Sequence, residues 1–88
     1  MSNNEDREVE FFDLNKSMRQ TKVPLICIYK HPKDYPDKYV ARLWDRNIPT
    51  QIMATSETLE GIREKIPEGM VRLNRDATDD PVIVETWI

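Results

Sequence analysis

The sequence of 88 residues is poor in the residue types that build reactive sites, with one cysteine, one histidine and two glycines. A single cysteine, Cys27, excludes an internal disulfide and a cysteine-rich metal site. Its place in the apolar run 25–28 favours a buried small hydrophobic side chain over a reactive thiol. Two glycines are too few for a glycine-rich phosphate-binding loop. We therefore expect no metal and no cofactor.

Long apolar runs and an excess of positive charge are also missing from the sequence. No run approaches the roughly 20 apolar residues of a membrane-spanning helix, and the polar, acidic residues 1–6 do not resemble a signal peptide. We therefore expect a cytoplasmic protein without membrane contact. The formal net charge is −3, whereas nucleic-acid-binding domains draw much of their affinity from basic residues. Nucleic acid is accordingly not expected as a ligand.

The clearest structural signal in the chain is that of a helix. Ser56 is a suitable N-cap residue, and Leu59, Ile62 and Ile66 follow it at the spacing of one apolar helical stripe. Pro67 ends the helix because it forces the preceding residue out of the helical region. A helix of about ten residues does not persist alone in water, so we expect it to pack on a sheet.

Strand-like runs lie on both sides of this helix. Residues 23–30, 39–45 and 50–55 precede it, and their short links indicate an antiparallel meander. Residues 70–75 and 82–88 follow it. The predicted fold class is therefore α+β, a small antiparallel sheet in β-β-β-α-β-β order with one helix packed on one face.

A chain of this length forms one domain. We expect residues 1–8 to be a disordered tail and residues 9–88 to be a single α+β domain. Within it, residues 9–22 are expected to dock loosely, since Phe11 and Phe12 would be wasted in a free tail. Their pattern does not distinguish helix from strand, and the segment could serve the core or bind a partner.

The proline-rich loop 31–38 is the candidate for a functional surface, because loops on a rigid sheet often carry function. Its candidate binding residues are His31, Lys33, Asp34, Tyr35 and Lys38. The ordinary alternative is a soluble hairpin loop. An enzyme would have to use His31 with an acidic neighbour, and no other catalytic arrangement is present. We therefore expect no enzyme and no catalytic residues.

Two further sequence patterns could indicate binding sites, but we expect both to have structural roles. Asp76, Asp79 and Asp80 do not have the spacing of a helix–loop–helix calcium site, so we expect a solvated turn. Residues 85–88 fit the C-terminal pattern that PDZ domains capture, but they also complete a strand that begins at residue 82. Trp44 and Trp87 are candidate binding residues that could equally serve the core or its rim.

Apolar residues fall on both faces of the expected sheet, and one short helix cannot cover both. The leading hypothesis is therefore a small non-catalytic domain that binds a protein partner or forms a homodimer.

Three runs resemble the N-terminal domain of HicB-like antitoxins: YVARLWD (39–45), IPT (48–50) and TSETLE (55–60). The resemblance implies a degenerate RNase H-like fold, in which a three-stranded meander leads into a helix. It also implies a binding role, in which the domain covers a small RNA-cleaving toxin. The chain departs from the family in its proline-rich loop 32–38 and in the two strands expected where the family has a DNA-binding segment.

Overall fold

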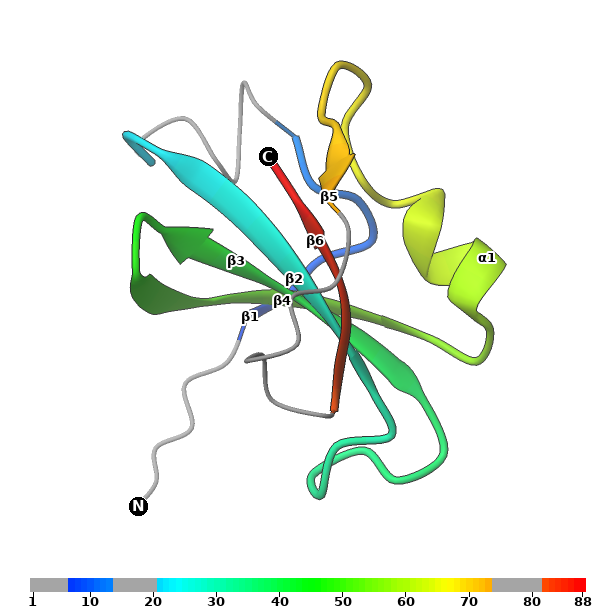
Figure 1. Cartoon of the computed structure of the whole chain (residues 1–88). Coiled ribbons are helices and arrows are strands. Elements are labelled where there is room, and N and C mark those ends of the chain that lie inside the picture. Colours follow the sequence, from blue (N-terminus) through cyan, green and yellow to red (C-terminus); the bar gives the residue numbers. More distant parts are fainter. Residues whose placement is uncertain (1–6, 14–20, 74–81) are drawn as a thin grey trace.

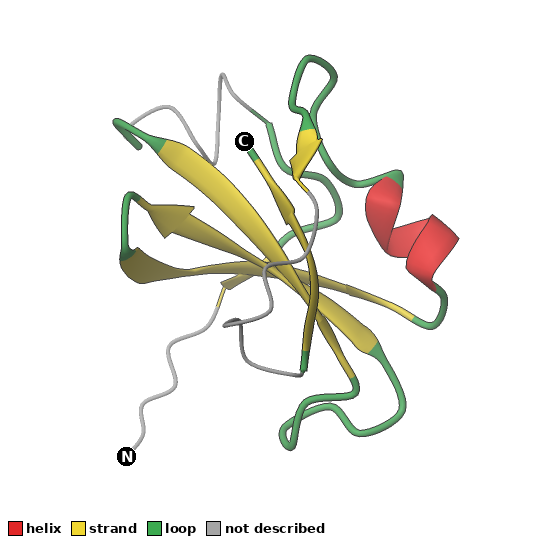
Figure 2. Ribbon diagram, viewed as in Figure 1, coloured by secondary structure: helices red, strands yellow, loops and turns green. Residues whose placement is uncertain are grey.

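The computed structural model describes residues 7–13, 21–73 and 82–88. These residues form a twisted six-stranded sheet with one short helix (Figures 1 and 2). The α+β class and the mainly antiparallel sheet are thereby confirmed. In chain order the elements are β1 (Arg7–Glu8), β2 (Pro24–Lys30), β3 (Tyr39–Asp45), β4 (Ile48–Ser56), α1 (Leu59–Arg63), β5 (Arg72–Leu73) and β6 (Ile83–Trp87).

The strands lie in the spatial order β1-β4-β3-β2-β6-β5. The meander of β2, β3 and β4 is antiparallel, as predicted, and β6 adds to the free edge of β2. The predicted chain order lacks β1, which pairs in parallel with β4 opposite Ile52 and Met53. Arg7 and Glu8 therefore lie in a strand rather than in a disordered tail. A two-residue polar strand shows no alternation of apolar residues, so the sequence pattern cannot reveal it.

The helix is shorter than predicted and begins later. Thr58 is the N-cap, and its Oγ1 accepts a hydrogen bond from the Gly61 N–H at 2.9 Å. Ser56, the predicted cap, is still the last residue of β4, where it pairs with Tyr39. Strand pairing therefore delays the helix by two residues. Beyond Glu64 the chain makes only tighter turns, so Ile66 lies outside the helix.

Gly61 is required by the way β4 turns into α1. A Cβ atom at this position would lie 2.2 Å from Ser56 Oγ and 3.0 Å from Thr58 Oγ1. The close neighbours are thus the side chains at the end of β4 and at the helix cap.

The buried cluster lies on the face of the sheet where Ile62 of α1 packs. Because side chains alternate along a strand, every second residue of β2 and β3 contributes to it. Its members are Phe12, Ile26, Ile28, Ala41, Leu43, Ala54 and Ile62. Leu59 and Ile66 pack against this cluster. We call this the helix side of the sheet.

The described part of the N-terminal segment runs past the C-terminal end of the helix. Phe12 is buried, and its N–H donates to the carbonyl of Lys65 at 2.9 Å. Lys65 Nζ in turn donates to the carbonyl of Glu10 at 3.0 Å. Several predicted features fall outside the described residues: the tail 1–6, residues 14–20 of the docking segment, the end of the strand 70–75, and the acidic turn at Asp76, Asp79 and Asp80.

Candidate functional site

A hollow of about 280 Å³ lies on the face of the sheet opposite the buried cluster. We call this the hollow face. The hollow is lined by Tyr29, Pro32, Asp34, Tyr35, Val40, Arg42, Trp44 and Pro49. These residues come from β2, β3, the start of β4 and the loop that joins β2 to β3. The alternation along β3 explains the placement, since Val40, Arg42 and Trp44 lie on one face while Ala41 and Leu43 enter the buried cluster.

The aromatic wall of the hollow is held by strand pairing and by one side-chain hydrogen bond. Tyr29 lies opposite Val40, and Trp44 lies opposite Pro49. Trp44 Nε1 donates to the Tyr29 hydroxyl at 3.1 Å, which links the two rings across neighbouring strands. These rings are only partly buried. They therefore present apolar surface in a fixed position.

A bulge in the pairing of β3 with β4 shapes the floor of the hollow. The register shifts between Arg42, which faces Met53, and Trp44, which faces Pro49. Arg42 Nη1 donates to the carbonyl of Thr50 at 2.8 Å, within the shifted region. Thr50 Oγ1 donates to the carbonyl of Leu43 at 2.7 Å. Side chains thus satisfy backbone groups that the bulge removes from the ladder.

The loop between β2 and β3 forms the remaining wall. Three backbone hydrogen bonds close it: Tyr35 N–H to Pro32 O at 2.9 Å, Lys38 N–H to Tyr35 O at 3.1 Å, and His31 N–H to Lys38 O at 2.9 Å. His31 has a positive φ of 50°, in the left-handed region that turns a chain sharply. The loop is therefore built as two successive tight turns.

Three of the predicted binding residues line the hollow: Asp34, Tyr35 and Trp44. Lys33 and Lys38 are exposed on the same loop without lining it. His31 is also exposed, and its ring packs edge-on against Tyr39 with the centroids 5.3 Å apart.

The other predicted binding residues lie elsewhere. Phe12 is buried in the core. Phe11 is 62% exposed, and Lys65 Nζ lies 5.6 Å from its ring centroid. Trp87 is half-buried and packs against the helix-side cluster.

The sequence reasoning missed most of the strand residues of the hollow, namely Tyr29, Val40, Arg42 and Pro49. The signal was present in the alternation of β3, which sets residues 40, 42 and 44 on one face. Which face would carry the helix was not determined by that alternation, because apolar residues occur on both.

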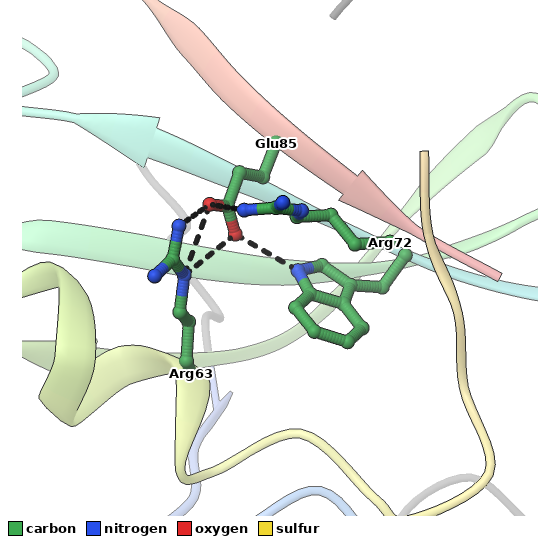
Figure 3. A network of polar contacts seen from close by, with 4 residues as sticks. Arg63, Arg72 and Glu85 are labelled. Atoms are coloured by element: carbon green, nitrogen blue, oxygen red, sulfur yellow. Dashed lines mark hydrogen bonds and ion pairs between the residues drawn. The ribbon is translucent and has the colours of Figure 1, made fainter. Parts of the chain in front are cut away.

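Glu85 forms a second cluster of polar residues, on the helix side (Figure 3). Its carboxylate is buried and receives hydrogen bonds from Arg63 Nε at 2.9 Å, Trp87 Nε1 at 3.0 Å and Arg72 Nη1 at 3.3 Å. Arg63 Nη2 also pairs with it. The hydrogen bond to Glu85 raises the pKa of the Arg63 guanidinium. The cluster links α1, β5 and β6, because Arg63 lies in α1, Arg72 in β5, and Glu85 itself in β6.

The pKa of Glu85 shows which effect dominates in this cluster. Burial alone would raise the pKa of its carboxyl group, but the hydrogen bonds from Arg63 and Trp87 and the neighbouring positive charges outweigh burial and lower it. The carboxylate is therefore held in its charged form, as a structural ion pair requires.

Neither a metal cluster nor a membrane-spanning helix is found in the described ranges 7–13, 21–73 and 82–88. No three His, Cys, Asp or Glu side chains there could hold a metal ion together. No helix there has the length and apolar character to cross a bilayer.

No protein-family model matches the chain, and the searches of curated proteins and of solved structures found no significant match.

Proposed function

We propose that this chain is a small non-catalytic protein-binding domain whose binding surface is the hollow face. One observation carries the proposal: three aromatic side chains and two prolines line a hollow on the face opposite the helix side. Tyrosine and tryptophan are the residues that most often dominate the binding energy of protein interfaces. Each offers a large apolar surface together with a polar atom that can find a partner.

The rigidity of the hollow supports binding. Trp44 and Tyr29 are joined by a hydrogen bond, and Arg42 is anchored to the carbonyl of Thr50. Ordering a flexible side chain costs about 0.5–1.5 kcal/mol when a complex forms. Side chains that are already ordered avoid much of that cost, which favours a surface of this kind over the exposed lysines of the same loop.

Exposed apolar residues extend the hollow face toward the β5–β6 edge. Arg72 lies opposite Trp87, which packs on the helix side. Alternation therefore puts Val71, Leu73 and Ile88 on the hollow face, where all three are exposed. A stable interface buries about 800 Å² on each partner. These residues supply apolar area beyond the hollow itself.

Catalysis at the loop has less support than binding. An enzyme would need His31 beside an acidic group in a pocket. His31 does not line the hollow, and its ring contacts Tyr39 instead. Asp34, which does line the hollow, has no histidine beside it in that lining. We therefore prefer recognition to acid–base chemistry at this surface.

The partner could be a second copy of the chain or another protein. The resemblance of runs 39–45, 48–50 and 55–60 to HicB-like antitoxins suggests a small nuclease as that protein. The identity of a bound partner would separate these candidates.

The proposal is tested by capture with matched variants of the full chain. An affinity-tagged chain is expressed in its native host as wild type, as Tyr35→Ser in the hollow, and as Glu64→Ser, which alters the exposed C-cap residue of α1. Light scattering reports a second copy, and mass spectrometry reports another protein. We expect wild type and Glu64→Ser to hold the same partner, and Tyr35→Ser to lose it at least tenfold while melting at the same temperature. Equal retention by all three chains would overturn the proposal.

A further inference from the structure

We infer that the hollow takes a proline-rich segment of a partner protein, in polyproline II conformation and with a basic residue that pairs with Asp34. The inference rests on the proposed function and names the chemistry of the ligand.

The position of the hollow in the sheet limits the ways in which a peptide can bind there. Peptides that add a strand to a sheet need an edge with unpaired backbone groups. The hollow is built on β2 and β3, which are interior strands: β3 lies between β4 and β2, and β2 lies between β3 and β6. Their backbone groups are used by the neighbouring strands. The ligand must therefore be recognised by side chains.

A polyproline II segment suits recognition by side chains. It has no internal hydrogen bonds, its backbone is already extended, and its proline rings project at a regular spacing. Such segments dock in grooves lined by aromatic residues. Tyr29, Tyr35 and Trp44 provide this kind of wall, and Pro32 and Pro49 complete it.

The size of the hollow argues against a helical ligand. A helix presents anchors over two or more turns and needs a long groove. At about 280 Å³ the hollow is slightly smaller than common small-molecule pockets, which range over about 300–1,000 Å³. A volume of this order holds a few side chains of an extended segment.

The negative charge of Asp34 places the basic residue of the ligand beside the loop wall of the hollow. Asp34 is exposed, and it has no ion-pair partner within the part of the chain that the structure describes. Arg42 lies in the lining as a positive charge anchored to Thr50. A cationic side chain is thus attracted to the loop wall by Asp34.

The test is a titration of the ¹⁵N-labelled full chain with short synthetic peptides, followed by NMR. The first peptide is APPLPPR, capped at both ends. A second peptide carries glutamate in place of arginine, and a third carries alanine in place of every proline. We expect saturable shifts of the Trp44 indole N–H and of the Tyr29 and Tyr35 amides with the first peptide. Affinity should fall at least fivefold for the glutamate peptide and below detection for the alanine peptide.

Two variants of the same loop separate recognition of charge from general effects. Asp34→Asn should abolish the preference for arginine over glutamate and leave the spectrum of the free chain otherwise unchanged. Asp37→Asn alters an exposed carboxylate outside the lining and should keep the preference.

The inference is overturned if the Trp44 indole resonance does not move at millimolar peptide, or if the alanine peptide binds as well as the first. This failure is distinct from failure of the proposed function. A partner that is lost on Tyr35→Ser but contacts the chain through a segment without proline would leave the binding role intact and refute this ligand.

Discussion

Glu85 is the one buried charged side chain in the described part of the chain, with 6% of its surface exposed. Burying a carboxylate is costly unless it is paired and hydrogen-bonded. Arg63, Arg72 and Trp87 meet that requirement from two other elements and from the same strand. The paired carboxylate therefore links the helix to the edge of the sheet without leaving a buried charge unpaired.

We expect Glu85→Gln to lower the free energy of unfolding by about 1.5–3 kcal/mol, because hydrogen bonds to a charged group are lost. Urea denaturation measures the change. Glu64→Gln, at the exposed C-cap of α1, serves as the control and should stay within about 0.5 kcal/mol of wild type. A Glu85→Gln chain as stable as this control would contradict the structural role of the cluster.

The same carboxylate makes stability depend on pH. The folded chain lowers the pKa of Glu85 below its ordinary value of 4.5, so folding favours the charged form. The stability that the charged Glu85 carboxylate adds to the folded chain is fully present above pH 4.5. It is lost as the pH falls through the lower pKa that Glu85 has in the folded chain. The difference in unfolding free energy between wild type and Glu85→Gln should therefore shrink below pH 4.5. A difference that stays constant from pH 7 to pH 2.5 would refute this.

The sequence could not predict this residue's role, because its partners Arg63 and Arg72 are 22 and 13 positions away. In the strand pattern Glu85 is simply a polar residue between Ile83 and Trp87 on the same face. Asp34, Tyr35 and Trp44 were predicted as binding residues, since loop position and exposed aromatic character can be read locally. Tyr29 was missed because its partner in the hollow, Trp44, is set by strand register.

At the scale of elements, α1 shows what local signals can and cannot determine. The apolar spacing of Leu59 and Ile62 correctly predicts a helix. Its start depends on β4, whose pairing with β3 continues to Ser56 and makes Thr58 the cap. Ser56 and Thr58 are both good N-cap residues, so the local sequence cannot distinguish them. The strand β1 has no local signature at all.

The close packing around Gly61, where β4 turns into α1, predicts an unusual effect of the substitution Gly61→Ala on stability. In a helix interior alanine is favoured over glycine by about 1 kcal/mol. Gly61→Ala should nevertheless destabilise the chain, since its Cβ would displace Ser56 Oγ and disturb the Thr58 cap. In a Ser56→Ala background the penalty should shrink by at least about 0.5 kcal/mol.

Urea denaturation of the four chains in this cycle measures the coupling. Glu60→Ala in the same helix is the control and should show no coupling to Ser56→Ala. An identical effect of Gly61→Ala in both backgrounds would show that Ser56 does not restrict this position.

At the scale of the whole molecule, the described residues combine a six-stranded sheet with one short helix, whose Ile62 belongs to the buried cluster. The sequence predicts apolar residues on both faces of the sheet, because they alternate along β2 and β3. It does not predict the hollow, which arises from the bulge between β3 and β4 and from the closed turns of the loop 31–38. Such features depend on register, which a periodic pattern alone does not specify.

We propose that partners contact the hollow face and not the helix side. Site-specific photo-crosslinking in the native host tests it most directly. A benzophenone amino acid replaces Tyr35 in one chain and Glu64 in another, so that each probe reports the molecules within its own reach. We predict a discrete crosslinked species from position 35 and none from position 64. Crosslinks from position 64 alone, or none from either position, would contradict the account.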